Sequence, residues 1–320
     1  MRITVARSLA EVEALRPLWV RALGDSSATM FQDFDWNLLA LRTLADQRPA
    51  FAAVEKDSSV AILPMVACNG GFALAGGPLF DYRDAICAGD SSALEAALES
   101  AASFGLPLSI AGVRGRKSAE KWSKLLPQTW TAAPFVSTKQ LSAEAFAAKH
   151  ARNRRALKRL NEVGAQVRKV KGSAEAVERI YLKKAKEPTG WGMNLFREER
   201  CIEFMRGAAT LPNSRCELFL LEVAEQPIAA LVTFIDHGVR RFYTTWMDPA
   251  WRKRSPGIAL LFEATRLTLE EGLDCDYMTG EQPYKLRFAT GSEPLYKVEA
   301  GASQLSALKR ETEEIELKAA

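Results

Sequence analysis

The sequence is poor in histidine and has no closely spaced cysteines, and these shortages argue against several kinds of site. Its 320 residues include two histidines and five cysteines. The cysteines are dispersed without a Cys-x-x-Cys pair, so the spacing of a zinc site is missing. Two isolated histidines, His150 and His237, give no basis for a Ser–His–Asp or Cys–His nucleophile. The odd, scattered set of thiols favours reduced core residues in a cytosolic protein.

Long apolar segments and a recognisable linker are also missing. No stretch reaches the roughly 18 apolar residues of a membrane span, and the first residues alternate like a strand, unlike a signal segment. We therefore expect a cytoplasmic protein, with peripheral attachment to the inner face of the membrane kept open. Hydrophobic residues make up 48% of the chain, enough for a sizeable core. The length suggests one large domain or two of ordinary size.

Apolar and turn residues predict two similar groups of strands. FAAVEKDSSVAIL (51–63) aligns with LFLLEVAEQPIAA (218–230), and each segment follows two predicted helices. We therefore predict a repeat of two halves, 1–140 and 141–320. The expected strands include 51–56, 60–67, 216–224, 228–236, 239–247 and 294–300.

Positive charge is concentrated in one segment. Residues 149–171 hold nine Lys or Arg and one Glu, although the whole chain has a net charge of only +4. We predict a basic helix over about 144–163. A solvated face is one interpretation, but like charges one turn apart destabilise a helix, which favours an anionic partner. A phosphorylated acceptor, cofactor phosphates, an anionic membrane surface and tRNA all remain open as that partner.

The segment WRKRSPGIALLFEAT (251–265) follows the last strand of the predicted meander and opens a helix over 256–271. A helix N-terminus binds anions through its free N–H groups and its dipole. Arg252, Lys253 and Arg254 add positive charge, and Gly257 would let a ligand approach the backbone closely. The alternative is an ordinary surface helix capped by Ser255, with proline in its first turn.

Residues 254–259 (RSPGIA) fit the Arg/Gln-x-x-Gly-x-Gly/Ala signature and resemble the GNAT acyltransferases, in which this signature follows the fourth strand of an antiparallel meander. Further segments resemble the FemAB-like and CelD-like branch, which has two GNAT-type halves. These segments are the basic run RNRRALKRL (152–160), the run from Asp276 through GEQPYKLRF (280–288), and the N-terminal FQDFDW and GGPLFDYRD.

The resemblance implies an α+β fold: a tandem GNAT-like acyl-CoA N-acyltransferase fold with central, mostly antiparallel sheets flanked by helices. It implies one acyl-CoA site, in the C-terminal half, and no metal. The N-terminal half is expected to lack a cofactor. Pro256 departs from a phosphate-binding turn in which every residue donates an N–H, because proline has none. The expected donors are therefore Ser255, Gly257, Ile258 and Ala259. The implied cofactor-binding residues are Thr245, Trp246, Met247, Arg252, Arg254, Ser255, Gly257, Ile258 and Ala259.

The resemblance also suggests catalytic roles. A backbone N–H among Thr245, Trp246 and Met247 would polarise the thioester carbonyl. Asp276 and Glu281 are the candidate bases, and Tyr284 would protonate the leaving thiolate. Lys285 would either hold an anionic acceptor or neutralise a developing charge. The expected substrate-binding residues are Arg154, Arg155, Trp191 and Arg287. Glu281, Lys285 and Arg287 could instead be surface ion-pair residues, and Trp191 a core anchor.

We therefore expect an N-acyltransferase in which an amine directly attacks an acyl-CoA. The resemblance suggests that the acceptor is a cell-envelope precursor, such as a sugar amine or lipid amine. One alternative is a FemAB-like aminoacyltransferase that uses aminoacyl-tRNA; the basic helix favours it and the intact signature disfavours it. The other is a non-catalytic binding protein on the same fold.

Overall fold

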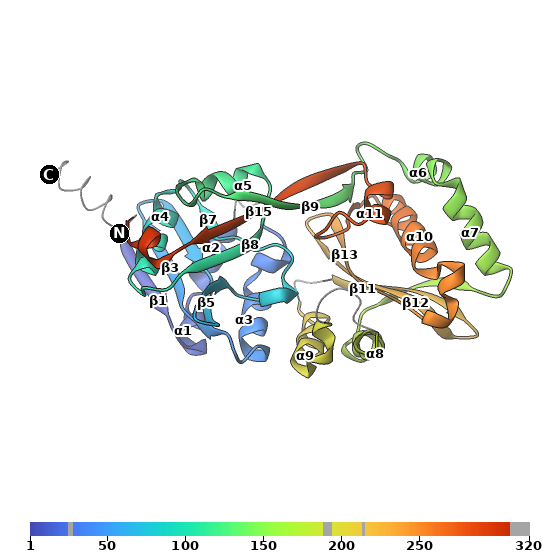
Figure 1. Ribbon diagram of the computed structural model, residues 1–320, viewed down its shortest axis with the longest axis horizontal. Helices are drawn as coiled ribbons and strands as arrows, with labels where there is room; N and C mark the ends of the chain where they lie inside the picture. Colours follow the sequence, from blue (N-terminus) through green and yellow to red (C-terminus); the bar gives the residue numbers. More distant parts are fainter. Residues whose placement is uncertain (25–27, 188–193, 213–214, 308–320) are drawn as a thin grey trace. The chain divides into compact units, whose positions relative to one another are not determined.

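The structure, a computed structural model, describes residues 1–24, 28–187, 194–212 and 215–307. The chain forms two compact units, Met1–Thr131 with the segment from Pro294 onward, and Ala132–Glu293. It enters the second unit within β9 (Gln128–Val136) and leaves it within β15 (Gly291–Ala300) (Figure 1). The division expected at 140 therefore differs from these units, because β15 returns to pair with β8 (Leu108–Arg114).

The first unit contains an antiparallel sheet in the order β1-β3-β4-β7. A second group of strands has the order β15-β8-β6-β5-β2. Helix α4 follows β7 and buries Ala93, Ala97 and Ala101 in the core that it shares with β3 and β4. The remaining bounds are β1 (Arg2–Ala6), β2 (Arg48–Pro49), β3 (Phe51–Lys56), β4 (Ser59–Leu63), β5 (Met65–Cys68), β6 (Gly71–Leu74), β7 (Ile86–Ala88), α1 (Leu9–Ala14), α2 (Arg16–Leu23), α3 (Phe34–Thr43), α4 (Ser92–Ala102) and α5 (Arg116–Lys121).

The strand predicted over 60–67 is divided in two. Strand β4 ends at Leu63 and β5 begins at Met65, on either side of Pro64. Proline has no N–H to donate to a sheet ladder, so the ladder ends where the chain reaches it. The two strands then join different sheets of the first unit.

The second unit contains strands in the order β10-β11-β12-β13-β14-β9. The predicted meander forms as β11 (Arg215–Val223), β12 (Gln226–Asp236) and β13 (Val239–Met247). Ala224 and Glu225 join the first pair, and His237 and Gly238 the second; all four have positive φ. Turns of this kind match the twist of antiparallel strands. The other strands are β10 (Gln166–Lys171) and the short β14 (Asp274–Asp276), which runs parallel to β13.

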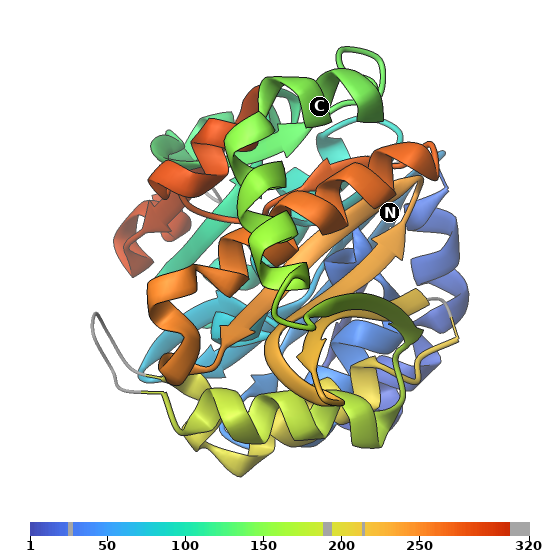
Figure 2. The same cartoon turned by 90° about the vertical axis from the view of Figure 1, so that its right-hand side faces the viewer.

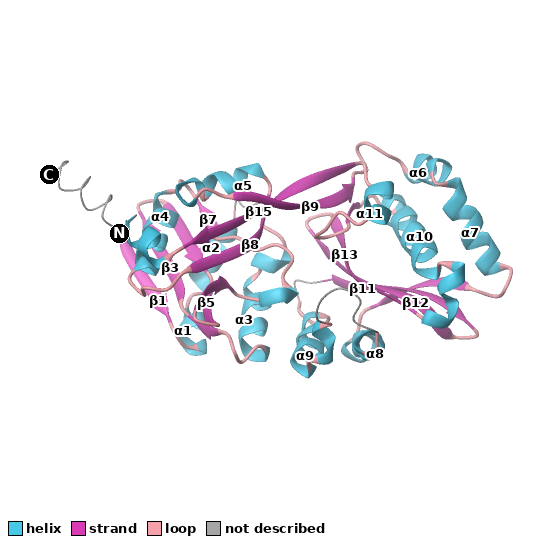
Figure 3. Cartoon of the chain, in the orientation of Figure 1, coloured by secondary structure: helices cyan, strands magenta, loops and turns pink. Residues whose placement is uncertain are grey.

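Helices cover both faces of this sheet. Helices α8 and α9 lie on one face, and α6, α7 and α10 on the other (Figure 3). Helix α7 crosses α10 (Figure 2), and Leu157 and Leu160 of α7 share a core with Leu260 of α10. No helix in the described ranges is long and apolar enough to cross a bilayer. The bounds are α6 (Ala143–Lys149), α7 (Ala151–Asn161), α8 (Ala174–Ala185), α9 (Glu199–Ala208), α10 (Pro256–Glu270) and α11 (Pro283–Phe288).

The helix predicted over 144–163 is divided at His150, between α6 and α7. The imidazole is buried, with ring centroids 4.6 Å from Phe146 and 4.9 Å from Phe288. Burial, with the nearby charges of Lys149 and Arg287, lowers the pKa of His150. The ring is therefore a neutral part of the core at neutral pH, in agreement with its isolation in the sequence.

The two units repeat one arrangement. In the first, β1-β3-β4-β7 is followed by α4; in the second, β10-β11-β12-β13 is followed by α10. The alignment of 51–63 with 218–230 places the hairpin β3–β4 over the hairpin β11–β12. The predicted mixed α/β fold with repeated, mostly antiparallel strands is confirmed.

Candidate active site

The sheet of the second unit opens at the end of β13. The parallel pairing of β13 with β14 stops at Arg241 opposite Asp276, whereas pairing with β12 continues to Met247. A cavity of about 460 Å³ lies at this end of β13 and at the start of α10. Its described lining residues are Lys184, Glu187, Thr245, Trp246, Met247, Arg252, Ser255, Gly257, Ile258, Leu261 and Tyr284.

The first turn of α10 offers fewer N–H donors than the sequence suggests. Ser255 has φ of 50°, and its side chain does not cap the helix, contrary to expectation. Its N–H already donates to the Arg252 carbonyl at 3.1 Å, and the Ala259 N–H donates to the Ser255 carbonyl at 3.2 Å. Within the described ranges, the N–H groups of Gly257 and Ile258 have no acceptor. Two donors therefore face a possible ligand, in place of the four expected.

Gly257 leaves open space in the cavity. A Cβ atom built at this position would meet only Met247, with its Cβ and Sδ atoms both at an ordinary contact distance of 3.8 Å. Gly257 does not have the positive φ that would demand glycine. Since neither backbone conformation nor packing excludes alanine, the missing side chain serves to keep the helix backbone accessible. This is the fit that a phosphate group held by the first turn requires.

The three cations before α10 differ in position. Arg252 lines the cavity, whereas the Arg254 guanidinium lies over the Trp251 ring, 5.5 Å from its centroid. Lys253 and Arg254 are exposed, and none of the three forms an ion pair with a described residue. Of the expected cofactor-binding residues, only Arg254 and Ala259 are outside the lining; Ala259 is buried in the core.

Tyr284 is the one expected catalytic residue that lines the cavity. It lies half-buried on α11, and burial raises the pKa of its phenol, which keeps the hydroxyl protonated at neutral pH. Its neighbour Lys285 points elsewhere, because its Nζ donates to the Thr279 carbonyl at 2.7 Å. Glu281 is exposed and outside the described lining.

Asp276 occupies the interior of the sheet. Its side chain is 1% exposed, Oδ2 lies 2.6 Å from Nη1 of Arg241, and Oδ1 accepts the Met278 N–H at 2.8 Å. Arg241 also pairs with Asp236 at 2.7 Å. This carboxylate therefore fastens β14 to β13 and to the following turn. It does not line the cavity, so the expectation that it faces a substrate is not met.

Three lining residues, Lys184, Glu187 and Leu261, were not anticipated from the sequence. Lys184, at the end of α8, and Glu187 form an ion pair at 2.6 Å. The only sequence signal nearby was Trp191, four residues after Glu187, which the resemblance makes an expected substrate-binding residue. Trp191, expected there, lies outside the described residues. Arg287, like Arg154 and Arg155, is exposed and does not line the cavity.

The positive charge predicted for 149–171 is concentrated on the helices. In β10, Arg168 pairs with Glu222 and Lys169 with Glu271. The exposed cations of α6 and α7 form no ion pair with a described residue, and we call them the cationic face. Its members are Lys149, Arg152, Arg154, Arg155, Lys158 and Arg159.

Comparisons with known proteins agree with this geometry. Residues 147–286 match the family model of an acetyltransferase (GNAT) domain. Similar solved structures include L-PGS from Bacillus licheniformis (11% identity, TM-score 0.61, 96% of this chain and 99% of that chain). They also include FemX (9%, 0.58, 97% and 100%) and a tandem GNAT protein from the clavulanic acid biosynthesis pathway (10%, 0.52, 94% and 99%). A search of curated proteins found no match.

Residues 147–286, which include most of the second unit, are thus similar to an acetyltransferase (GNAT) domain. As a whole the chain shares its fold with FemX and with the tandem GNAT protein, and it consists of two units. The tandem GNAT-like fold that the resemblance implies is thus confirmed, and the RSPGIA signature lies within the residues that match the GNAT model. Within the described ranges, no three His, Cys, Asp or Glu side chains gather into a metal site.

Proposed function

We propose that this protein is an N-acyltransferase that takes its acyl group from acyl-CoA and binds this donor in the second unit. The observation that carries the proposal is the first turn of α10. It presents two free N–H groups, from Gly257 and Ile258, to a cavity that Arg252 also lines. Helix N-termini with such groups bind phosphates through hydrogen bonds and the helix dipole.

The roles of the other lining residues follow from their chemistry. When bound, acyl-CoA supplies an activated acyl group as a thioester. The apolar side chains of Trp246, Met247, Ile258 and Leu261 exclude water from it, and the β13 backbone polarises its carbonyl. Tyr284 donates the proton that the leaving thiolate needs. No cysteine or histidine is among the described lining residues, which supports direct attack by an amine.

The acceptor and its location are also part of the proposal. We place the acceptor among cell-envelope precursors that carry an amine, as the FemAB-like resemblance suggests. The protein would act in the cytoplasm, where the cationic face allows contact with an anionic bilayer. The first unit would have a structural role, without a donor of its own.

Calorimetric titration of the full chain with acetyl-CoA tests the donor site. Gly257→Ala is the informative variant, because its methyl group meets only Met247 in the protein yet fills the space beside the free N–H groups. We expect acetyl-CoA affinity to fall about tenfold. The thermal midpoint should stay the same or rise, because alanine has a higher helix propensity than glycine. Unchanged affinity in Gly257→Ala would place the donor elsewhere.

A second candidate function rests on the cationic face. Six exposed cations without described ion pairs suit a polyphosphate such as tRNA, the donor carrier of a FemAB-like aminoacyltransferase. Salt titration of tRNA binding separates the two functions. Several phosphate contacts predict a steep loss of affinity with salt, and a smaller slope for Arg155→Gln. Salt-insensitive or absent tRNA binding leaves acyl-CoA as the donor.

A further inference from the structure

The ion pair between Lys184 and Glu187 places opposite charges on the wall of the cavity. The Nζ and Oε2 atoms are 2.6 Å apart, and about a quarter of each side chain is exposed. The two residues lie three positions apart, at the end of α8 and just after it. A partly exposed pair of this kind contributes little to stability.

The backbone around this pair is held by a different residue. The Asn194 side chain donates from Nδ2 to the carbonyls of Lys184 at 2.8 Å and Ala185 at 3.4 Å. Its Oδ1 accepts the Phe196 N–H at 3.2 Å. The end of α8 therefore keeps its position when the two charged side chains separate. Separating the two charged side chains therefore costs little free energy, and the ion pair is not needed to hold the backbone of the cavity wall.

Glu187 is also the one carboxylate in the described lining. Asp276 is buried against Arg241, and Glu281 is exposed outside the lining. The cations of the lining are Lys184 and Arg252, and Arg252 belongs to the α10 end, where the donor is proposed. An acceptor amine entering the cavity therefore meets one negative group and one positive group side by side.

We propose that this pair recognises an acceptor whose ammonium group lies beside an anionic group, either a carboxylate or a phosphate. Glu187 binds the ammonium and removes its proton, and Lys184 binds the anionic group. The inference rests on the proposed function and adds the acceptor class and the base. It replaces Asp276 and Glu281, the bases expected from the sequence.

The proton and bond changes balance as follows. Glu187 takes one proton from the ammonium, and the freed amine nitrogen forms a C–N bond to the thioester carbonyl carbon. The C–S bond breaks, and the sulfur receives the proton of the Tyr284 hydroxyl. The nitrogen loses its second proton to water, and Tyr284 regains one from water. The products are an amide, a free thiol and one proton, which Glu187 releases to solvent.

The test compares matched amines with acetyl-CoA as the donor, using thiol release by the full chain as the readout. Glycine against glycinamide reports on a carboxylate, and phosphoethanolamine against ethanolamine reports on a phosphate. We expect kcat/KM to be at least tenfold higher for the anionic member of one pair or of both pairs. Equal rates within both pairs overturn the inference.

Variants separate the two roles. Lys184→Met should abolish the preference for the anionic amine by raising its KM, with little change for its neutral partner. Glu187→Gln should lower kcat about 100-fold for every amine and leave the acetyl-CoA Kd unchanged. The controls are Lys186→Met and Glu203→Gln, which remove equal charges from exposed positions outside the lining and should behave like the wild type. Variants that match these controls refute the inference.

Failure of the proposed function gives a different result. In that case acetyl-CoA neither binds nor releases thiol with any amine. Saturation-transfer NMR with the same four amines then decides the acceptor inference by itself. Binding of glycine or phosphoethanolamine that Lys184→Met abolishes supports it, and the absence of such binding overturns it.

Discussion

Helices α4 and α10 follow the fourth strand of the same antiparallel arrangement, one in each unit, but their N-termini are satisfied differently. At α4, the carboxylate of Asp90 accepts the Ser92 N–H at 2.9 Å and the Ser92 hydroxyl at 2.6 Å. At α10, no side chain caps the helix, and the N–H groups of Gly257 and Ile258 have no described acceptor. At the N-terminus of α4, the first unit supplies a carboxylate of its own. At the N-terminus of α10, the second unit leaves the N–H groups without one.

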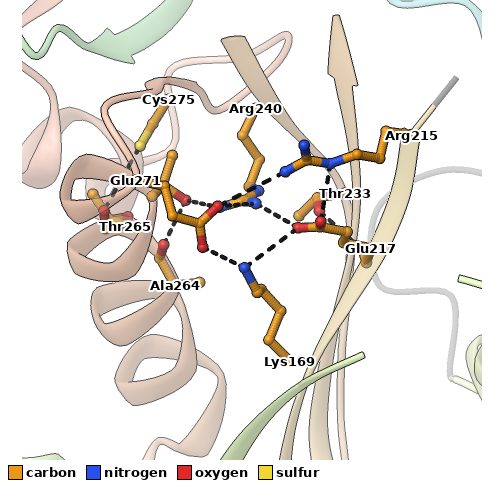
Figure 4. Close-up of polar contacts among 10 residues, drawn as sticks. Lys169, Arg215, Glu217, Thr233, Arg240, Ala264, Thr265, Glu271 and Cys275 are labelled. Carbon is orange, nitrogen blue, oxygen red and sulfur yellow. Dashed lines mark hydrogen bonds and ion pairs between the residues drawn. The ribbon is translucent and has the colours of Figure 1, made fainter. Parts of the chain in front are cut away.

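The C-termini also differ, but here α10 makes the ionic contacts and α4 makes a local hydrogen bond. The residue after α4, Ser103, makes a local hydrogen bond to the Ser100 carbonyl at 2.7 Å. The residue after α10, Glu271, belongs to a charged cluster with Lys169, Arg240, Glu217 and Arg215 (Figure 4). Arg240 is fully buried, and its Nη1 donates to the Thr268 hydroxyl at 2.7 Å.

The cluster shows how α10 is positioned without a cap. Burial alone would raise the pKa of Glu271, but hydrogen bonds from Lys169 and Arg240 outweigh it and lower the pKa. Glu271 is therefore charged at neutral pH and ties the C-terminus of α10 to β10 and β13. Helix α10, whose first turn has no side-chain cap, is therefore held at its last turn.

Removing the C-terminal anchor should have the largest effect. Arg240→Met takes away the buried partner of Glu217 and Glu271, and we expect it to lower the free energy of unfolding by about 3 kcal/mol. Native-state hydrogen exchange should locate the loss in α10 and leave α4 unchanged. Arg215→Met, which removes an exposed member of the same cluster, should cost less than about 1 kcal/mol. Equal losses in both variants would contradict an anchor at Arg240.

Giving α10 an anion of its own should have the next largest effect. Ser255→Asp places a carboxylate beside the free N–H groups, at a left-handed φ that aspartate tolerates. We expect the Kd of acetyl-CoA to rise at least tenfold, while the thermal midpoint stays equal or increases because a negative charge suits a helix N-terminus. Ser255→Asn has the same shape without the charge and should stay within threefold of the wild type. Similar affinities for both variants would argue against an anion site.

Removing the anion of α4 should have the smallest effect. Hydrogen bonds from the Ser92 side chain and backbone lower the pKa of Asp90 from its ordinary 3.8. A lowered pKa in the folded state means that this stabilisation is present above pH 3.8 and is lost as the pH falls through the folded pKa. Asp90→Asn should therefore reduce the thermal midpoint slightly at pH 7, with a smaller difference at pH 3. Ser91→Ala, at a residue without a capping bond, is the control; acetyl-CoA affinity should not change in either variant.

The sequence predicted much of the local structure correctly. The meander strands and the helix that begins at Pro256 formed within about two residues of their predicted bounds. The aligned segments 51–63 and 218–230 form the same hairpin in both units. These features depend on apolar periodicity and on turn residues. Both act over a few neighbouring positions and can therefore be predicted from the sequence. The RSPGIA signature likewise lies within the residues that match the GNAT model.

The tertiary structure decided which residues reach the candidate site. Asp276 and Glu281 are five residues apart in the sequence, yet one is buried against Arg241 and the other is exposed. Lys184 and Glu187 line the cavity although they are about 70 residues from the signature. Burial and hydrogen-bond partners are set by contacts between distant segments, and local patterns carry no information on them.

The first turn of α10 shows both contributions in one segment. The sequence alone determined that Pro256 lacks an N–H and that Gly257 lacks a side chain, because these are properties of the residues themselves. Only the folded structure shows that the N–H groups of Ser255 and Ala259 donate to carbonyls of the same segment. Those of Gly257 and Ile258 have no acceptor among the described residues. That outcome depends on how the turn before α10 folds back on itself, so that the Ser255 N–H reaches the Arg252 carbonyl.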